Sequence, residues 1–326
     1  MMVENKTSPR EKVAVLLLAH GSPDKPEDVP EFLRAVTSGR ALPEGAVKEI
    51  THRYQLIGAS PLTRLTLRQG DLLSTALGLP VYAGMRNWKP WIADVRAQME
   101  RDGITRAIVI CLAPQDSRTS VGLYRKALLG EDPPSFAVDL ISSWHDQPQL
   151  IAAFAERLKA ALLRAEQQGG VAPAVIFTAH SVPERTILGT DGEGDPYADQ
   201  ARQTAELVAR AAGLMDGAWF FAFQSQGMSG GPWLGPTVEE TILGLKEMGN
   251  PAVLMQPIGF VCDHVEVLYD IDIAFQKFAE ENGIMLTRVE SLNDSPLFIR
   301  ALAELVKERL AAPAAADTAS TRASSR

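Results

Sequence analysis

Two apolar runs that both end in Ala-His constrain the fold of this chain more than any other feature. Residues 13–23 read VAVLLLAHGSP, and residues 174–183 read AVIFTAHSVP. Each run has the length of one buried strand, and the Ser and Pro that follow favour a turn. A chain that repeats such a signal after about half its length is predicted to contain two similar domains.

Further short apolar runs alternate with helix-length segments along the chain. The expected strands are Val13–Ala19, Val81–Gly84, Ala107–Leu112, Ala137–Ser142, Val175–Ala179, Trp219–Phe223, Ala252–Pro257 and Met285–Val289. The clearest helices, residues 61–77 and 148–168, carry apolar residues at three- and four-residue spacing. First helical turns are expected at Pro61, Pro90, Pro148 and Pro236. Alternating strands and helices predict an α/β fold of two similar doubly wound, flavodoxin-like domains with parallel sheets.

The two domains are expected at residues 1–150 and 151–312, followed by a small, polar and disordered tail at 313–326. In doubly wound folds, ligands bind beyond the carboxyl ends of the strands. His20 and His180 both follow such strand ends. We therefore expect them to approach one ligand site from opposite domains.

Composition excludes several classes of protein. The net charge of -8 argues against a nucleic-acid partner. Two cysteines without a CxxC spacing argue against a disulfide framework, a zinc-thiolate site and an iron–sulfur cluster. No apolar run is long enough to span a membrane, and the first twelve residues lack the apolar region of a signal peptide. We expect a cytoplasmic protein.

A cluster of acidic residues follows the predicted strand 252–257, in the segment GFVCDHVEVLYDID. Asp263, Glu266 and Asp270 are spaced by three and four residues, which on a helix places them on one face, with His264 and Asp272 to the side. A solvated acidic face is the common explanation of such spacing. The position of this helix at the ligand edge favours a second one, in which His180 and Glu266 form an N/O site for a divalent transition metal. From the residues alone, a capping or packing role explains His180 equally well.

A third group combines basic, hydroxyl and aromatic side chains in the segments THRYQLIGASPLTR, GMRNWKPW, SRTSVGLYRK and GGPWLGP. Arginine suits two-pronged contacts to carboxylates, and a tryptophan face suits a flat apolar ligand. The candidates are Arg53, Tyr54, Ser60, Arg86, Tyr124, Trp88, Trp91 and Trp233. Competing signatures fail, because the chain has no GxGxxG after a strand and no GxxxxGK[ST].

The chain resembles the ferrochelatase family over nearly its whole length, up to about residue 310. The resemblance rests on the motifs RYQLIGASPLT, DGITRAIVICLAP, TAHSVPE, GDPYADQ, FQSQG with PWLGP, and PIGFVCDHVEVLYDID, in that order. It implies two α/β domains around a porphyrin cleft and an enzyme that inserts ferrous iron to make heme. Iron is then a substrate, no cofactor is permanently bound, and no iron–sulfur cluster is expected. The implied partners are the porphyrin, the heme product and other heme-pathway enzymes.

The resemblance also implies roles for individual residues. His180 and Glu266 match the metal-site histidine and glutamate of the family, and Asp270 matches a carboxylate one turn further on. Several positions resemble the type that works on coproporphyrin: Arg53, Tyr54, Ser60 and Tyr124. His20 stands where that type often has tyrosine, and AHGSP instead resembles short cobalt and sirohydrochlorin chelatases, in which that histidine binds metal. We expect His20 to be an axial ligand of iron from the opposite face.

The expected substrate-binding residues are therefore His20, Arg53, Tyr54, Ser60, Arg86, Tyr124 and Trp233, and the expected catalytic residues are His180, Glu266 and Asp270. The substrate is coproporphyrin III or protoporphyrin IX. Two alternatives remain open at this stage: a cobalt or sirohydrochlorin-type chelatase, and a non-catalytic heme or porphyrin carrier. A flavin-binding protein is disfavoured, because no loop suited to cradle a phosphate is evident.

Overall fold

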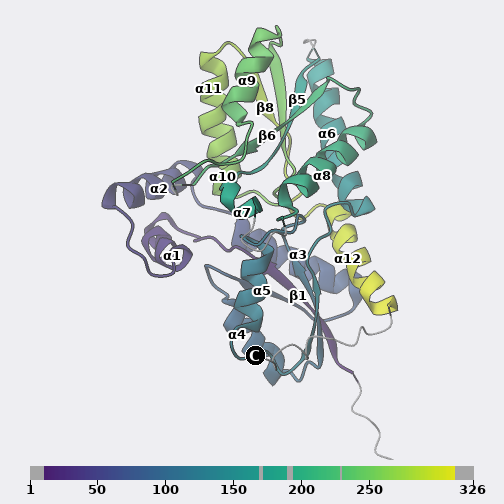
Figure 1. Ribbon diagram of the computed structural model, residues 1–326. Coiled ribbons are helices and arrows are strands. Elements are labelled where there is room, and N and C mark those ends of the chain that lie inside the picture. The colour runs from purple at the N-terminus through teal and green to yellow at the C-terminus, as the bar shows by residue number, and fades with distance from the viewer. Residues whose placement is uncertain (1–10, 169–171, 189–193, 228–229, 313–326) are drawn as a thin grey trace, which may run out of the picture.

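Each of the two Ala-His runs forms an inner strand of a four-stranded parallel sheet (Figure 1). The computed structural model describes residues 11–168, 172–188, 194–227 and 230–312, so the tail expected to be disordered lies outside the described residues. The strands are β1 Val13–Ala19, β2 Val81–Met85, β3 Arg106–Cys111, β4 Ala137–Ile141, β5 Ala174–His180, β6 Trp219–Gln224, β7 Ala252–Pro257 and β8 Met285–Arg288.

The two sheets have the same topology. The first has the order β2-β1-β3-β4 and the second the order β6-β5-β7-β8, with every neighbouring pair parallel. Strands β1 and β5 thus occupy equivalent positions. This confirms the predicted α/β fold with two similar doubly wound halves, and it explains why the Ala-His signal appears twice.

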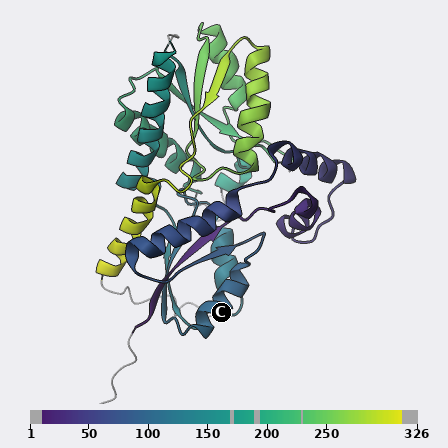
Figure 2. The same cartoon turned by 180° about the vertical axis from the view of Figure 1, so that it is seen from behind.

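Helices cover both faces of each sheet. They are α1 Val29–Val36, α2 Glu44–Ile57, α3 Leu62–Leu77, α4 Ile92–Arg101, α5 Val121–Leu129, α6 Pro148–Gln167, α7 Glu184–Leu188, α8 Tyr197–Ala212, α9 Val238–Glu247, α10 Val265–Leu268, α11 Gln276–Glu281 and α12 Pro296–Ala311. A short 3₁₀ turn, Pro26–Asp28, precedes α1, and a π-helix, Asp270–Phe275, joins α10 to α11. Both views show α1 and α2 projecting from the side of the molecule (Figures 1 and 2).

The halves share one hydrophobic core. Val15 and Ile108 from the first sheet belong to the same buried cluster as Val175 and Phe177 from the second. Helix α12 packs against α3 of the first half and against α6. Its Phe298 stacks on Trp144 at a centroid distance of 6.1 Å. Because α12 contacts both halves, the boundaries expected near residues 150 and 312 stay a prediction.

Three of the four prolines expected in first helical turns lie outside the helices. Pro148 is the first residue of α6, and Pro61 is the N-cap of α3. Pro90 and Pro236 each precede an N-cap residue, Trp91 and Thr237. At those two sites the backbone carbonyls of the prolines accept hydrogen bonds from Met85 and Phe223, at 2.7 and 2.8 Å. The prolines therefore belong to the turns that leave β2 and β6 rather than to α4 and α9.

Candidate functional site

The turns after β1 and β5 hold the two histidines close to neighbouring backbone. Gly21, directly after His20, has a φ of +79°, and an added Cβ would lie 2.8 Å from the Cβ of Met85. Gly259 lies against β5, where an added Cβ would be 2.9 Å from the Cα of Ala179. Side chains at these two positions would displace the turns, so glycine is required at both.

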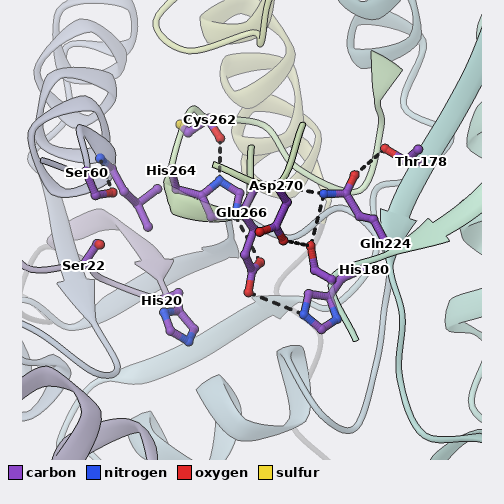
Figure 3. A network of polar contacts seen from close by, with 12 residues as sticks. His20, Ser22, Ser60, Thr178, His180, Gln224, Cys262, His264, Glu266 and Asp270 are labelled. Carbon is purple, nitrogen blue, oxygen red and sulfur yellow. Dashed lines mark hydrogen bonds and ion pairs between the residues drawn. The ribbon is translucent and has the colours of Figure 1, made fainter. Parts of the chain in front are cut away.

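His180 and Glu266 form the centre of the site. His180 is the last residue of β5, and Glu266 lies in α10, directly beyond the end of β7. The His180 Nε2 lies 3.5 Å from Oε1 of Glu266, and the side chains are 32% and 36% exposed (Figure 3). The structure thus brings together the two predicted metal-site residues and leaves both within reach of a ligand.

His264 is a third member of this cluster, and its contact was not predicted. Its Nε2 lies 3.3 Å from the other carboxylate oxygen of Glu266, Oε2. The expected helix would have placed His264 to the side. Instead, His264 is the N-cap of α10 with an extended backbone (φ −160°, ψ −176°). The extended backbone at this N-cap directs the His264 ring towards Glu266 instead.

The pKa values of His180 and Glu266 both depart from their ordinary values. Burial alone would lower the pKa of His180, but the Glu266 carboxylate raises it above its ordinary value. Burial would likewise raise the pKa of Glu266, but His180 and His264 together hold it well below its usual range. Each partner therefore favours the charged form of the other, an imidazolium facing a carboxylate.

Asp270 begins the π-helix and lies beside Glu266, with contacts to both halves of the molecule. Its carboxylate accepts a hydrogen bond from the Ser225 hydroxyl and lies 3.8 Å from the Arg53 guanidinium of α2. Burial raises the pKa of Asp270, the Ser225 hydroxyl opposes that shift, and the Glu266 charge adds to it. Asp270 is thus a carboxyl group that takes up a proton more readily than an exposed aspartate.

Gln224 and Ser225, in the FQSQG motif, position this acidic segment. Gln224 is buried, receives a 2.6 Å hydrogen bond from Thr178 of β5, and donates to the backbone carbonyl of Glu266 at 3.0 Å. Ser225 has a φ of 61°, a left-handed backbone that costs a serine about 1 kcal/mol. Figure 3 shows that this network links the ends of β5 and β6 to α10.

His20 lies on the opposite side of Glu266 from His180 in Figure 3. Its Nδ1 faces the carbonyl of Gly21 at 3.0 Å, and its Nε2 lies 2.9 Å from the Asn87 amide. The neutral tautomer that fits both contacts carries its proton on Nδ1 and accepts from Asn87. Burial and the Arg86 guanidinium lower the pKa of His20 to about 4, so this imidazole is neutral at pH 7.

The predicted carboxylate anchors divide into accessible and buried groups. Arg53 is 38% exposed, pairs with Glu49 and Asp270, and covers the ring of Tyr269. Tyr54 is 1% exposed, and its hydroxyl is bonded to Ser22 Oγ at 2.9 Å. Ser60 is also buried, and its hydroxyl accepts from the N–H of Leu62 at the start of α3.

The remaining members of that group come from three further elements. Arg86 follows β2, lies half-buried over the ring of Tyr124 of α5, and its Nε has no hydrogen-bond partner among the described residues. Tyr124 itself is buried. Trp233 forms a bridge with Pro183, directly after the His180 turn. Trp88 is buried against Phe32, in the core beneath α1.

Asp263, expected on the helix face, and Asp272, expected to the side, both pair with Arg288 rather than with the residues around Glu266. Helix α10 begins at Val265, so Asp263 precedes it and cannot share its face. Asp263 is bonded to Arg288 and Asn293, and Asp272 of the π-helix is bonded to Arg288. The expectation that Asp263, Glu266 and Asp270 share one helix face is therefore wrong for Asp263.

Tyr197, in the motif GDPYADQ, is a further residue whose contact with the site the sequence did not reveal. It is buried at the start of α8, and its hydroxyl donates to the backbone carbonyl of His180 at 2.8 Å. Across the residues that the structure describes, no set of three or more His, Cys, Asp or Glu side chains is arranged to hold a metal ion. His180 and Glu266 are thus a pair of candidate ligands rather than a complete cage.

The amino-acid sequence of this chain is similar to the sequences of known proteins. A family model described as Ferrochelatase matches residues 12–310. A ferrochelatase of Acidobacterium capsulatum is 56% identical over 312 residues, covering 92% of this chain and 95% of the relative. A coproporphyrin III ferrochelatase of Geobacillus sp. is 34% identical, covering 92% of this chain and 99% of the relative.

The fold also resembles solved structures. A structure of CbiX, described as the terminal enzyme for siroheme biosynthesis in denitrifying bacteria, aligns with a TM-score of 0.50 at 16% identity. That alignment covers 90% of this chain and 98% of the CbiX chain. At this identity the likeness concerns the fold alone, which both chains build from two α/β halves.

Proposed function

This chain belongs to the ferrochelatase family, and on that premise we propose that it inserts ferrous iron into a porphyrin in heme biosynthesis, as a lyase-class metal chelatase. The observation that carries the proposal is the His180–Glu266 pair, in which an imidazole nitrogen and a carboxylate oxygen lie 3.5 Å apart at the carboxyl end of the second sheet. Both side chains are about one-third exposed, so a substrate can reach them.

The reaction exchanges protons for a metal ion. Two pyrrole N–H bonds break, the iron forms bonds to the pyrrole nitrogens, and no electron is transferred. A protein accelerates this exchange by binding a bent macrocycle more tightly than a flat one, because only differential binding lowers the barrier. Strain of about 1–5 kcal/mol is available from remote contacts.

His180 and Glu266 supply the polar chemistry. The Glu266 carboxylate raises the pKa of His180 and so favours its protonated form. Release of that proton frees the Nε2 lone pair, which then holds iron or accepts a pyrrole proton, while Glu266 performs the complementary task. Asp270, whose pKa is raised by burial, is placed to receive the next proton.

The first half supplies the opposite wall of the site. His20 is neutral and presents Nε2 to Asn87. If His20 ligates iron from this side, Asn87 must release that nitrogen. Arg53 and Arg86 are the candidates for carboxylate contacts, whereas the buried Tyr54, Ser60 and Tyr124 support them from the core. Trp233 is proposed to pack against the macrocycle beside the His180 turn.

Iron is the substrate in this proposal, and no iron–sulfur cluster or other resident cofactor takes part. Both cysteines, Cys111 and Cys262, are free and buried. Burial raises the pKa of each thiol to about 12. The thiolate that metals prefer is therefore disfavoured at both positions, which supports this view.

None of the helices in the described parts of the chain is both long enough and apolar enough to span a bilayer. The cytoplasmic location and the association with other heme-pathway enzymes stay predictions.

The test is an anaerobic assay that follows the Soret band with ferrous iron and either coproporphyrin III or protoporphyrin IX. We expect enzyme-dependent insertion for at least one porphyrin, and the rate ratio identifies the preferred substrate. His180→Ala and Glu266→Gln should each remove most of the rate while the proteins stay folded by circular dichroism. Heme binding without any enhancement of insertion would instead identify a carrier. Cobalt insertion into sirohydrochlorin alone would identify the other type of chelatase.

A further inference from the structure

A polar cluster behind the site joins both ends of the segment that carries Glu266 and Asp270. Its members are Asp263, before α10; Asp272, in the π-helix; Arg288, at the end of β8; and Asn293, which precedes α12. We call these four residues the bracket. All four are at least partly buried.

Asn293 holds the first end. Its Oδ1 accepts from the N–H of Asp263 at 2.9 Å, and its Nδ2 donates to Oδ2 of Asp263 at 2.9 Å. Its own backbone N–H donates to the carbonyl of Val261 at 2.9 Å. Asn293 has a φ of 49°, in the left-handed region that asparagine tolerates better than most residues. This conformation aims the side chain and the backbone at the same turn.

Arg288 joins the two ends. Its Nη1 lies 3.2 Å from Oδ1 of Asp263, so both oxygens of that carboxylate are engaged. Its Nε and Nη2 donate to the two oxygens of Asp272 at 2.7 and 3.0 Å, a planar two-pronged contact. The bracket therefore fixes residues 263 and 272, and every residue of α10 lies between them.

The first half is attached to the same bracket. Gln69 of α3 is fully buried, and its Nε2 donates to the carbonyl of Asn293 at 2.7 Å and to Cys262 Sγ at 2.8 Å. Helix α3 follows α2, which carries Arg53 towards Asp270. The bracket thus lies where the acidic segment of the second half, residues 263–272, contacts the first half.

We propose that Asn293 is a positioning residue of the iron site, which acts through Asp263 to hold Glu266 and Asp270 in place; this rests on the function proposed above. Asn293 does not contact Glu266, and its effect passes through the Asp263 turn and the His264 N-cap. Loss of the side-chain contacts should therefore impair iron use more than porphyrin binding, because the apolar walls and the arginines lie on other elements.

Two substitutions of Asn293 test this with the backbone preserved. Asn293→Gly keeps the left-handed backbone, which glycine adopts without strain, and removes both side-chain hydrogen bonds. Asn293→Asp keeps the acceptor for the Asp263 N–H but turns a carboxylate towards Asp263. The matched control is Asn250→Gly, which removes one asparagine hydrogen bond, to Leu245, after α9 and away from the site.

We expect Asn293→Gly to lower kcat/KM for iron by about 10-fold or more, because small displacements of reacting groups cost at least that much. The dissociation constant of the porphyrin, measured by fluorescence quenching, should change less than about 2-fold. Asn293→Asp should lower kcat/KM for iron further than Asn293→Gly does, because its carboxylate faces that of Asp263. The double variant Asp263→Asn/Asn293→Asp should recover much of the loss, because the exchanged amide and carboxylate again complement each other and Arg288 still finds an acceptor. Asn250→Gly should match the wild-type protein.

Hydrogen exchange measured by mass spectrometry over residues 259–275 provides a readout that does not need turnover. Exchange there should be faster in Asn293→Gly than in Asn250→Gly, and slower again in the double variant. Wild-type iron kinetics and wild-type exchange in Asn293→Gly, or equal losses in iron and porphyrin binding, would overturn the positioning role. If the wild-type protein inserts no iron, the proposed function fails, while the exchange rates still decide whether the bracket orders α10.

Discussion

His20 and His180 stand at the carboxyl ends of equivalent strands, one directly after β1 and one as the last residue of β5, yet burial and neighbouring charges shift their pKa values in opposite directions. His180 faces the Glu266 carboxylate, which raises its pKa, whereas burial and Arg86 lower the pKa of His20 to about 4. The charged form of His180 is therefore favoured, whereas His20 is neutral at neutral pH. His180 can exchange a proton with Glu266. The Nε2 lone pair of His20 accepts a hydrogen bond from the Asn87 amide.

The lowered pKa of His20 predicts a loss of stability in acid. The unfolded chain binds a proton at the ordinary pKa of 6.5, but the folded protein binds it only near pH 4. The contribution of His20 is therefore complete above pH 6.5 and is lost as the pH falls towards 4. At about 1.4 kcal/mol per unit, the loss reaches about 3 kcal/mol.

The variant His20→Gln should remove this dependence. Its unfolding free energy, from urea denaturation at several pH values, should fall about 3 kcal/mol less than that of the wild-type protein between pH 7 and pH 4. His52→Gln, at an exposed histidine of α2, is the control and should follow the wild-type curve. Identical pH dependence in His20→Gln and wild-type protein would contradict the assignment.

The Glu266 carboxylate predicts a second titration. Glu266→Gln removes the charge that raises the pKa of His180, while burial remains, so that pKa should fall. The histidine ring signals in NMR spectra measure this directly, and His180→Ala identifies the resonance.

The directions of the two pKa shifts also fix the pH range in which the His180–Glu266 ion pair stabilises the fold. The ion pair stabilises fully between about pH 4.5 and 6.5, is lost above this range as His180 deprotonates, and is lost below it as Glu266 protonates. A His180 pKa that stays raised in Glu266→Gln would show that another group is responsible.

Sequence patterns predicted that His180, Glu266 and Asp270 lie at the site, because strand ends and helical spacing are set by residues close together in the sequence. They missed His264 and misplaced Asp263 because both depend on where α10 begins. The apolar residues of 259–272 show no break at the start of α10, and no strong N-cap residue marks it. His264 is the N-cap, but its side chain makes no capping hydrogen bond. Only the extended backbone at His264 turns its ring towards Glu266.

At the scale of elements, the strands were predicted to within one residue at each end, because continuous apolar runs identify buried parallel strands. The π-helix and the pairing of Arg288 with Asp263 and Asp272 were not predicted. They depend on the contact between β8 and the acidic segment, which no local pattern records. The site therefore rests on predictable strands, and tertiary contacts arrange the segment between them.

The close approach of β5 and β7 predicts a selective effect at Gly259. An alanine Cβ there would lie 2.9 Å from the Cα of Ala179, and backbone cannot move aside as a flexible side chain can. Gly259→Ala should lower the unfolding free energy by about 1–3 kcal/mol and displace the turn that leads to Glu266. Gly45→Ala, on α2 with no atom within 4 Å of the added Cβ, should leave stability unchanged or slightly raised. Urea unfolding measures both, and equal stabilities would show that the turn can relax.

At the scale of the whole molecule, the two repeated sheets share one buried core and a set of polar contacts. Val15 and Phe177, one from each sheet, belong to one buried cluster, and α12 contacts α3 and α6. Polar contacts join the halves as well. Gln115 donates to Thr204 at 3.1 Å, and the buried Asp195 of the second half accepts from the N–H of Arg118 in the first at 2.8 Å.

Such an interface predicts that both halves unfold in one transition. Phe298 of α12 is fully buried and stacks on Trp144, so Phe298→Ala should cost about 3–5 kcal/mol and destabilise both sheets together. Tryptophan fluorescence and far-ultraviolet circular dichroism should then give coincident urea transitions in the wild-type protein and in the variant, with the midpoint lowered equally for both probes. Leu163→Ala, at an exposed position of α6, is the control and should shift neither transition. If the probes instead separated into two transitions, the halves would be independent domains, and the positions of His20 and His180 relative to each other would depend on a hinge rather than on the shared core.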